Sequence, residues 1–483
     1  MRRTEPALEN PCQLNAIVSS FLGLIPKNID PEFKRSPKDF TRTRKLPFQK
    51  LVTFILSLCA SGKSKGVDIK SGEFFRTARR SGLWPEAEAV HRCSLSRSRK
   101  KLPWSLFRDI LEDAVEPAYK LWPRDPSYLW HGMSVIGVDG SKYNLPATED
   151  NRKEFDPQSG LDHEGKGQYP QCLVSTAYDV FRRIPVARTV LSIHVSEREE
   201  ALNLLPSIRP GAVLVFDRGY PSYHVICSLR DNYNGYFIFR CPAKSTFPAV
   251  EEFVHIGRQE GYILFHPSNN YLEGLSRRQK KAKVIQLRII RLVSPDGTVS
   301  VLLTNLLNQS LFPREDIVDL YFRRWEVETN YRNEKVVLEI EEFHGKSANS
   351  IRQELYAVTI MSVIARTLMV LTSRVHGSST SQFQFKSAIM TLEGVKSWRS
   401  LKVNSIGIRA CPGLDPGSGA GFREILCLDA LRPLPVRTMS RLRGEKFFPL
   451  VSQHLPIPAS LRGFFMFEAK PGAKEIEFGL DLL

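Results

Sequence analysis

The chain has 483 residues, 42% of them apolar, and its 68 Lys and Arg against 51 Asp and Glu give a formal net charge of +17. This length allows roughly three domains of about 150 residues each, and the apolar fraction can fill their cores. The longest apolar runs, Leu51 to Ala60 and Ala357 to Leu371, are too short or are broken by Arg366, and the N-terminus lacks an apolar signal core. No membrane role is therefore expected, whereas the basic excess permits nucleic-acid binding without proving it.

The cysteines are scattered, with no CxxC pair and no neighbouring histidine at zinc-finger spacing. This distribution predicts reduced core thiols in a cytoplasmic protein. The eight cysteines are at positions 12, 59, 93, 172, 227, 241, 411 and 427.

The first 130 residues are predicted to form a helical DNA-binding region. They hold 24 Lys or Arg against 14 Asp or Glu, which accounts for ten of the seventeen net positive charges. Apolar stripes at Leu51–Cys59 and Phe107–Ala114 have helical spacing. A basic cluster between them fits two interpretations, a recognition helix in the major groove or a solvated face that touches only phosphates. The cluster contains Arg92, Arg97, Arg99, Lys100 and Lys101.

From Met133 to about Phe239 the pattern alternates between strands and helices, which is typical of a mixed α/β sheet. Two aspartates, Asp139 and Asp217, each follow a buried apolar run and should be held rigidly at a strand end. Each also has a structural explanation: Asp139–Gly140 is a common hairpin turn, and Asp217 could be a turn residue paired with Arg218. Strands are expected at Gln171–Tyr178, Ile184–Ile193 and Gly235–Arg240, and helices at Ser196–Leu205 and Tyr223–Leu229.

The stretch from about Cys241 to Asn308 is predicted to be a β-rich insertion. Asp217 and Glu328 lie 111 residues apart, which is more than one crossover connection needs. A basic segment, SRRQKKAK at Ser276–Lys283, could contact the DNA backbone or serve only surface solubility. Strands are expected at Gly261–His266, Ala282–Leu292 and Val299–Leu303, which are rich in Val, Ile and Leu.

A helix is predicted to start near Pro313, with acidic residues near the positive end of its dipole. The side chains of Tyr321, Arg324, Glu328 and Lys335 follow one another at intervals of 3, 4 and 7 residues, which returns them to one helical face. Glu326 would point to the far side. Taken alone, Glu328 could equally be a solvated residue that forms helical ion pairs with Arg324.

Together, Asp139, Asp217 and Glu328 in the order strand, strand, helix indicate metal-dependent phosphoryl transfer. Cleavage of a phosphodiester can use two divalent ions about 4 Å apart, and three carboxylates are enough to hold them. Mg²⁺ is the expected ion, and Mn²⁺ can replace it because both take oxygen ligands. Arg324 and Lys335 would then face the phosphates of a polyanion.

The motifs VDGS and DRGY, together with Tyr321, Arg324, Glu328 and Lys335, resemble the insertion-sequence-four family of bacterial DDE transposases. That family's signature is Y, two residues, R, three residues, E, six residues, K, and it is met here without a gap. The resemblance implies an RNase H-like core with Asp139, Asp217 and Glu328 as metal ligands. It also implies that Arg324 and Lys335 touch the DNA backbone near the scissile phosphate, supported by Tyr321. The similarity covers most of residues 35–375, including FTRTRKLPF, SLSRSRKKLPW and EIEEFHGKSANSIRQELYA.

The C-terminal region, residues 376–483, does not follow the family's usual ending. A helix is predicted at Phe385–Leu392, and residues 411–421 hold six Pro or Gly in eleven positions, which predicts loop or disorder. A dimerisation region, an altered reading frame and an appended segment all remain open for the remainder. The expected division is 1–130, 131–240, 241–308, 309–375 and 376–483, with the core made of the second and fourth segments.

The sequence thus predicts a DNA transposase that binds the ends of an insertion sequence and carries out strand cleavage and strand transfer. Its partners would be double-stranded DNA and a second protomer, because the two ends of the element must be paired. The protein would be cytoplasmic, and nucleoid-associated when bound to DNA. One alternative is an inactive DNA-binding relative that represses its parent element. Another is a housekeeping nuclease, which the basic N-terminal region and the large insertion disfavour.

Overall fold

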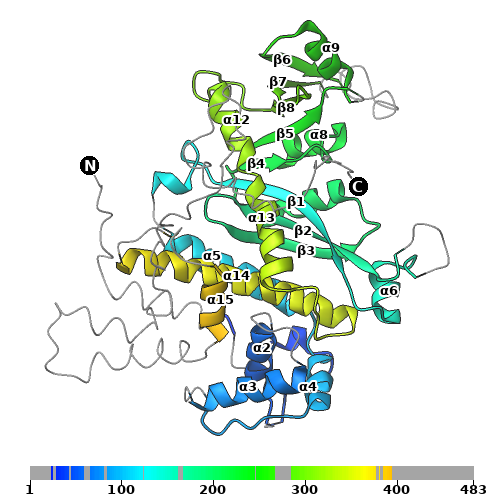
Figure 1. The fold of residues 1–483 in the computed structure, drawn as a ribbon, viewed down its shortest axis with the longest axis vertical. Helices are drawn as coiled ribbons and strands as arrows, with labels where there is room; N and C mark the ends of the chain where they lie inside the picture. Colours follow the sequence, from blue (N-terminus) through cyan, green and yellow to red (C-terminus); the bar gives the residue numbers. More distant parts are fainter. Residues whose placement is uncertain are drawn as a thin grey trace, which may run out of the picture. The chain divides into compact units, whose positions relative to one another are not determined.

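The computed structural model describes residues 23–25, 29–42, 45–58, 66–80, 84–122, 125–160, 167–244, 246–266, 284–376, 380 and 385–393 (Figure 1). The basic segment Ser276–Lys283, the Pro/Gly-rich residues 411–421 and half of the cysteines lie outside these ranges. The described cysteines carry thiols that are not joined in disulfides, as predicted. They are Cys93, Cys172, Cys227 and Cys241, and all except Cys93 are buried.

An eight-stranded mixed sheet forms the core, with strand order β3-β2-β1-β4-β5-β8-β7-β6. β1 pairs antiparallel with β2, and β2 pairs antiparallel with β3. On its other side β1 pairs parallel with β4, and β4 pairs parallel with β5. The mixed α/β class is confirmed. The strands of this half are β1 (Val135–Asn144), β2 (Gln171–Asp179), β3 (Ile184–Ser192), β4 (Val213–Phe216) and β5 (Tyr236–Pro242).

The predicted insertion continues this sheet. β8 pairs antiparallel with β5, and β7 lies between β8 and β6 in the strand order. Buried Leu287, Ile289 and Ile290 show why β7 sits inside the sheet, because a central strand is covered on both faces. The three predicted strands are confirmed, and a helix precedes them. These elements are α9 (Pro248–Ile256), β6 (Glu260–Phe265), β7 (Ile285–Val293) and β8 (Val299–Thr304).

Helices cover both faces of the sheet at β1. Successive residues of a strand point to opposite faces, so Gly137 and Gly140 mark the two sides. A Cβ on Gly137 would meet Val327 of α13 (Trp325–Arg332), whereas one on Gly140 would meet Glu197 of α7 (Glu197–Asn203). α13 therefore lies on the Gly137 face and α7 on the Gly140 face. Two further helices of this part are α6 (Glu149–Phe155) and α8 (Tyr223–Asn232).

The N-terminal region is helical, as predicted, and its last helix packs on the core. α2 (Phe48–Ser57) buries the first predicted stripe, and α5 (Ser105–Leu121) buries the second, with Phe107, Ile110 and Leu111 at its centre. α5 lies beside α14 and also contacts β3 (Figure 1). The helices between them are α3 (Val67–Arg80) and α4 (Arg92–Arg99).

α14 (Ala348–His376) is long and apolar enough to cross a membrane by length and composition alone. Its most apolar stretch is 89% buried inside the protein, which is the situation of a core helix. The hydroxyls of Ser362 and Thr367 in this stretch donate hydrogen bonds to backbone carbonyls of the same helix. α15 (Phe385–Glu393) follows and contacts α14, and it confirms the helix predicted at Phe385–Leu392.

Two local expectations were wrong. Asp139 is in the middle of β1, which runs on to Asn144, so it does not end a strand or form a hairpin turn with Gly140. The helix expected from Pro313 through Lys335 is divided into α12 (Arg314–Phe322), α13 and a π-helical turn at Asn333–Val337. At the break between α12 and α13, the amide of Arg324 donates to the Tyr321 carbonyl and the amide of Val327 donates to the Arg324 carbonyl. These bonds span three residues, which is the tighter 3₁₀ pattern.

Candidate active site

Two strands bring Asp139 and Asp217 to neighbouring positions. Val138 and Phe216 are the last partners in the parallel ladder of β1 and β4, and the two aspartates are the residues that follow them. β1 continues beyond this point, whereas the chain leaves β4 in a turn in which the Gly219 amide donates to Asp217 Oδ1 over 2.6 Å. That hydrogen bond orients the Asp217 carboxylate.

Glu328 reaches the same place from α13. This helix lies so close to β1 that the side chain of Val327 occupies the space that a Cβ on Gly137 would need. Gly137, Asp139 and Ser141 alternate along one face of β1, so the helix that carries Glu328 covers the face from which the Asp139 side chain projects.

The Arg324 guanidinium lies between two of the carboxylates. One terminal nitrogen is 2.7 Å from Glu328 Oε1 and the other is 3.6 Å from Asp139 Oδ2. Burial disfavours the charge, but Tyr321, Asp139 and Glu328 outweigh that effect and raise the pKa of Arg324. The buried Nε has no hydrogen-bond partner among the described residues. Arg324 is therefore a permanent cation inside the acidic cluster.

The Asp139 carboxyl is in a setting that opposes its ionisation. Burial is the main reason, and the charges of Asp217 and Glu328 add to it, while Arg324 and the Gly140 amide favour the charged form. The net result raises the pKa of Asp139 from 3.8 to about 7. Asp217 and Glu328 thus both lie close enough to Asp139 to oppose its ionisation, as expected of carboxylates that share one site.

The donor set suits a divalent ion, because Mg²⁺ and Mn²⁺ both take carboxylate oxygens. In the arrangement seen here the described residues include no group of three or more His, Cys, Asp or Glu side chains placed to hold a metal ion. A guanidinium, not open space, lies between Asp139 and Glu328. The residues fit such an ion chemically, and Arg324 would have to give up its carboxylate contacts for both acids to serve as ligands.

The remaining motif residues are engaged within the protein. Lys335 donates to Ser141 Oγ over 2.9 Å and to the Lys142 carbonyl over 2.6 Å, and it lies over the Tyr143 ring. Tyr321 is buried, and its hydroxyl is hydrogen-bonded to Arg324. The sequence predicted that these side chains belong together but not that two cations would contact the protein's own oxygen atoms.

Several residues at the site were not singled out from the sequence. Glu197 of α7 lies against Gly140, and burial together with the charge of Asp217 raises the pKa of its carboxyl. Tyr220, the last residue of the DRGY motif, is buried with a hydroxyl that has no hydrogen-bond partner among the described residues. Tyr331 donates its hydroxyl to the Asp139 carbonyl over 2.7 Å. The DRGY motif could have drawn attention to Tyr220, but no pattern marks Glu197 or Tyr331.

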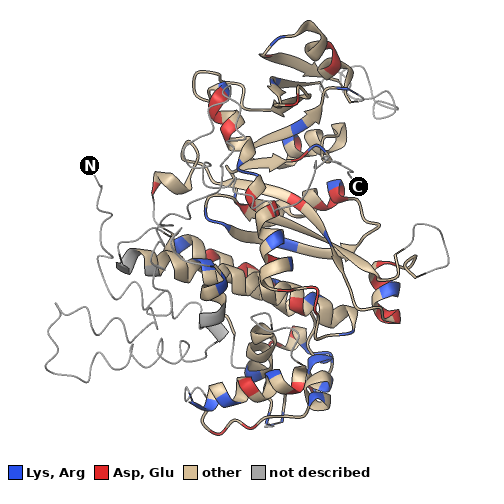
Figure 2. Cartoon of the chain, in the orientation of Figure 1, with Lys and Arg blue, Asp and Glu red and all other residues tan. Residues whose placement is uncertain are grey.

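Lys and Arg positions gather on α4 (Figure 2). The side chains of the basic cluster are divided between the surface and the interior. Arg97 and Lys100 are exposed at the end of α4. Lys101 forms an ion pair with Asp39. Arg99 is largely buried and pairs with Glu354 of α14 over 2.8 Å, so its charge is already neutralised inside the protein.

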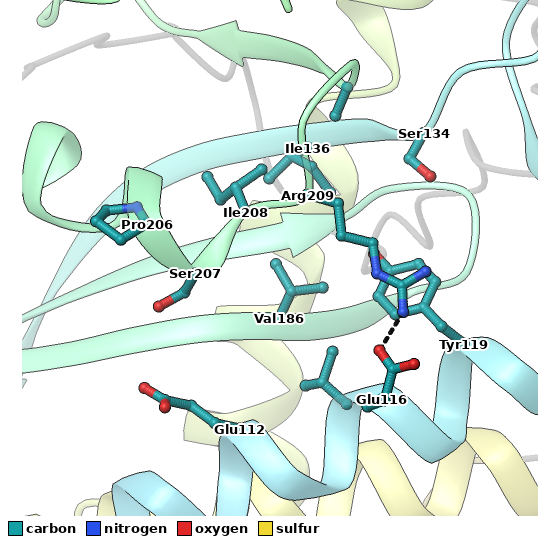
Figure 3. A pocket seen from close by; sticks show the side chains of 12 residues that line it. Glu112, Glu116, Tyr119, Ser134, Ile136, Val186, Pro206, Ser207, Ile208 and Arg209 are labelled. Atoms are coloured by element: carbon teal, nitrogen blue, oxygen red, sulfur yellow. Dashed lines mark hydrogen bonds and ion pairs between the residues drawn. The ribbon is translucent and has the colours of Figure 1, made fainter. Parts of the chain in front are cut away.

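A separate cleft of about 450 Å³ lies among α5, β1, β3 and the segment 206–212 (Figure 3). Ile136 of β1 lines it, and since Ile136 and Asp139 point to opposite faces of the strand, the cleft is not part of the acidic site. Arg209 spans it, paired with Glu116 and stacked over Tyr119. The cleft contains none of the predicted site residues.

Comparisons with known proteins agree with the motifs. A family model described as "Transposase DDE domain" matches residues 130–364. Transposase InsG for insertion sequence element IS4 from Escherichia coli (strain K12) is 22% identical over 430 residues, which is 86% of this chain and 87% of that protein. A putative transposase, y4zB, from Sinorhizobium fredii (strain NBRC 101917 / NGR234) is 27% identical over 161 residues, 33% of this chain and 43% of that protein.

Among solved structures, the cryo-electron microscopy structure of the piggyBac transposase synaptic complex with hairpin DNA aligns with a TM-score of 0.41 at 10% identity. The alignment covers 85% of this chain and 83% of that one. The assignment itself depends on the sequence matches, because the domain match spans all three acidic residues and the InsG match spans most of the chain. Residues 130–364 thus match a transposase DDE domain, and the chain is similar over most of its length to the transposase of an IS4 element.

Proposed function

We propose that this protein cleaves DNA at the ends of an insertion sequence and joins the freed ends to new DNA, with Asp139, Asp217 and Glu328 as ligands of divalent metal ions. The observation that carries the proposal is the shared acidic site on β1, β4 and α13, in which Arg324 contacts Asp139 and Glu328 together. Mg²⁺ is the proposed ion and Mn²⁺ a substitute, since the donor set consists of carboxylate oxygens.

When bound, such ions supply a more acidic water and neutralise charge on the phosphate oxygens. In the first step the oxygen of a water molecule bonds to phosphorus, the bond to the 3′ oxygen breaks, and that oxygen takes up a proton. In the second step the 3′ hydroxyl loses its proton and bonds to another phosphorus, releasing that phosphate's own leaving oxygen. The same carboxylates would serve both steps.

Arg324 is proposed to exchange its carboxylate contacts for a DNA phosphate when ions and DNA bind. Its Nε donor is buried and unused, and a planar guanidinium matches a phosphate with two parallel hydrogen bonds. Tyr321 would hold the arginine side chain, and Lys335 would add positive charge beside Ser141. The loss of Arg324's charge from the acidic cluster would be balanced by the entering metal ions.

DNA ends are proposed to bind along the N-terminal helices, where Arg97 and Lys100 are exposed. Arg99 and Lys101 are less available because each already pairs with an acid of the protein. Two ends must be held together for joining, so we propose a complex of at least two protomers. Such a protein would work in the bacterial cytoplasm, on the nucleoid when bound to DNA.

The test is cleavage of a duplex that carries the inverted repeats bracketing the reading frame. Wild-type protein should cut it with Mg²⁺ or Mn²⁺ and not after chelation. Asp139→Ala, Asp217→Ala and Glu328→Ala should each abolish cleavage while retaining binding of the duplex, since only the chemical step needs the acids. Glu252→Gln, which changes an exposed carboxylate of α9, should cut normally.

Two results would overturn the proposal. If the wild-type protein binds the repeats but never cuts in either ion, a repressor descended from a transposase becomes the better description. If the three alanine variants still cut, the nuclease activity belongs to other residues.

A further inference from the structure

One side chain joins the strand that carries Asp139 to the helix that carries Glu328. Tyr331 is one helical turn after Glu328, so the two residues share a face of α13. Its side chain is buried, and its hydroxyl donates to the backbone carbonyl of Asp139 itself over 2.7 Å, with the Val174 carbonyl 3.2 Å away. Any movement of α13 along β1 would stretch this hydrogen bond.

We propose that Tyr331 is a positioning residue that sets the separation of Asp139 and Glu328, so that both can serve one metal site. The inference rests on the proposed function. It assigns Tyr331 no contact with DNA or metal; the residue acts through the backbone of β1 and through its own helix.

A buried network next to Tyr331 holds the same helix in register. Glu334 accepts hydrogen bonds from Arg188 of β3 over 2.6 Å, from the Tyr143 hydroxyl over 2.6 Å and from Asn330 over 3.0 Å. Arg188 and Glu334 are almost fully buried, so the pair is costly to break. Contacts from two strands and from α13 itself thus fix one turn of the helix, and Tyr331 lies between that turn and Glu328.

The backbone at this point is also unusual. Glu334 and Lys335 belong to the π-helical turn Asn333–Val337, and such turns often occur at functional sites. The wider turn lets Glu334 point at Arg188 while Lys335 reaches Ser141. The helix therefore contacts β1 on both sides of Asp139: at Gly137 through Val327 and at Ser141 through Lys335.

The contacts predict what removing one hydroxyl would do. Without the Tyr331 hydroxyl, the side-chain contacts that remain between Asp139 and α13's carboxylate run through Arg324. Arg324 has to leave the carboxylates for metal to bind, so in the metal-bound state the Tyr331 hydroxyl would remain as the direct contact with the Asp139 backbone, beside the contacts at Gly137 and Ser141. Its loss should therefore weaken metal binding more than it weakens DNA binding.

The experiment compares Tyr331→Phe with Tyr233→Phe in the full-length chain. Tyr233 is the matched control because its hydroxyl also donates to a backbone carbonyl, that of Ala212 just before β4, over 3.1 Å and away from the acidic residues. Mn²⁺ binding is measured without DNA, by titration followed with electron paramagnetic resonance. Tyr331→Phe should bind Mn²⁺ about tenfold more weakly than the wild type, the lower end of the effect of removing a supporting contact, and Tyr233→Phe should match the wild type.

DNA cleavage at increasing Mn²⁺ concentration is the second measurement. Tyr331→Phe should need correspondingly more Mn²⁺ for half-maximal cutting, reach a near-normal rate at saturating ion, and bind the terminal repeats as the wild type does. If Tyr331→Phe fails to fold, Asn330→Ala, which removes one donor to Glu334, carries the same test with a smaller expected shift.

The outcomes separate the two claims. A wild type that cuts DNA, together with a folded Tyr331→Phe whose Mn²⁺ affinity equals that of Tyr233→Phe, overturns the positioning role and leaves the proposed function intact. A wild type that neither binds Mn²⁺ nor cuts overturns both.

Discussion

The charge of Asp139 depends on what occupies the space in front of it. Its carboxylate is buried beside two other acids, and Arg324 only partly compensates. The sequence indicated which three acids form the site, because each acid lies in a short motif that can be recognised without the structure. It did not indicate the role of Arg324 as an internal counter-ion, since the 3.6 Å contact with Asp139 joins residues 185 positions apart. That distance follows from how α13 packs on β1, which no spacing rule records.

This setting leads to a pH prediction for protein stripped of divalent ions. The folded pKa of about 7 lies above the ordinary 3.8, so the stabilisation from the protonated carboxyl is fully present below the ordinary value and is lost as pH rises through about 7. Asp139→Asn cannot ionise. The variant should therefore gain stability relative to the wild type as pH rises from about 4 to about 7, as measured by urea unfolding in the presence of chelator. Glu252→Gln should show no such trend, and a parallel pH dependence of wild type and Asp139→Asn would refute the prediction.

At the scale of elements, the strands and most helices were predictable because apolar runs and helical stripes reflect burial directly. β2, β3 and α8 all lie where the sequence placed them. The division of the expected helix at Arg323 and Arg324 was not predictable, because neither proline nor glycine occurs there. It comes with tertiary contacts, in which Glu326 pairs with Arg183, Arg324 with Asp139, and Glu334 with Arg188.

The close packing of α13 on β1 gives a second prediction. Gly137→Ala would place a Cβ 2.4 Å from Val327 Cγ2, and valine is too stiff to turn aside easily. The helix must shift, so the variant should lose about 1–3 kcal/mol of unfolding free energy and most of its cleavage activity. Gly72→Ala is the control, because its Cβ would meet nothing within 4 Å inside α3; it should be about 0.5–1 kcal/mol more stable. Equal stability of the two variants would show that α13 adapts freely.

At the scale of the whole molecule, a buried ion pair is one of the contacts that join the N-terminal helices to the core. Arg99 donates to Glu354, to Gln353 and to the Ser350 carbonyl, all on α14. Glu354 also accepts the amides of His344 and Gly345. The sequence suggested Arg99 as a DNA contact because a basic cluster has the same sequence pattern whether its side chains face solvent or pair inside the protein. Here the pairing residue, Glu354, is 255 positions away in the chain.

A third prediction separates the two kinds of arginine on α4. Arg99→Met should lower the unfolding free energy by about 3–5 kcal/mol, because it removes the cation that is paired with the buried Glu354 carboxylate, and Arg99→Met with Glu354→Gln should recover part of that loss. Arg97→Met, which changes an exposed side chain, should alter stability by less than about 0.5 kcal/mol. Chemical denaturation of the three proteins provides the comparison. A large loss for Arg97→Met, or none for Arg99→Met, would contradict this division of roles.

DNA affinity should fall more in Arg97→Met than in Arg99→Met, which is the opposite of the order expected for stability. Arg97→Met should weaken binding to specific and unrelated duplexes alike and reduce the slope of log affinity against log salt by about one unit, as expected when one phosphate contact is lost. Electrophoretic mobility shifts at several salt concentrations measure this slope. An unchanged slope in Arg97→Met would exclude α4 from the DNA surface.

The stacking of Trp104 on Tyr356 and the long contact between α5 and α14 have a practical result for anyone dissecting this protein. A fragment trimmed to the matched segment 130–364 would keep α14 up to residue 364 but lose α5, which packs beside it. The whole helix is apolar enough to pass for a bilayer-spanning segment, and the truncation would expose side chains on it that are buried in the full chain. Such a fragment should aggregate or enter detergent micelles, whereas one that begins before α2 should stay in aqueous buffer.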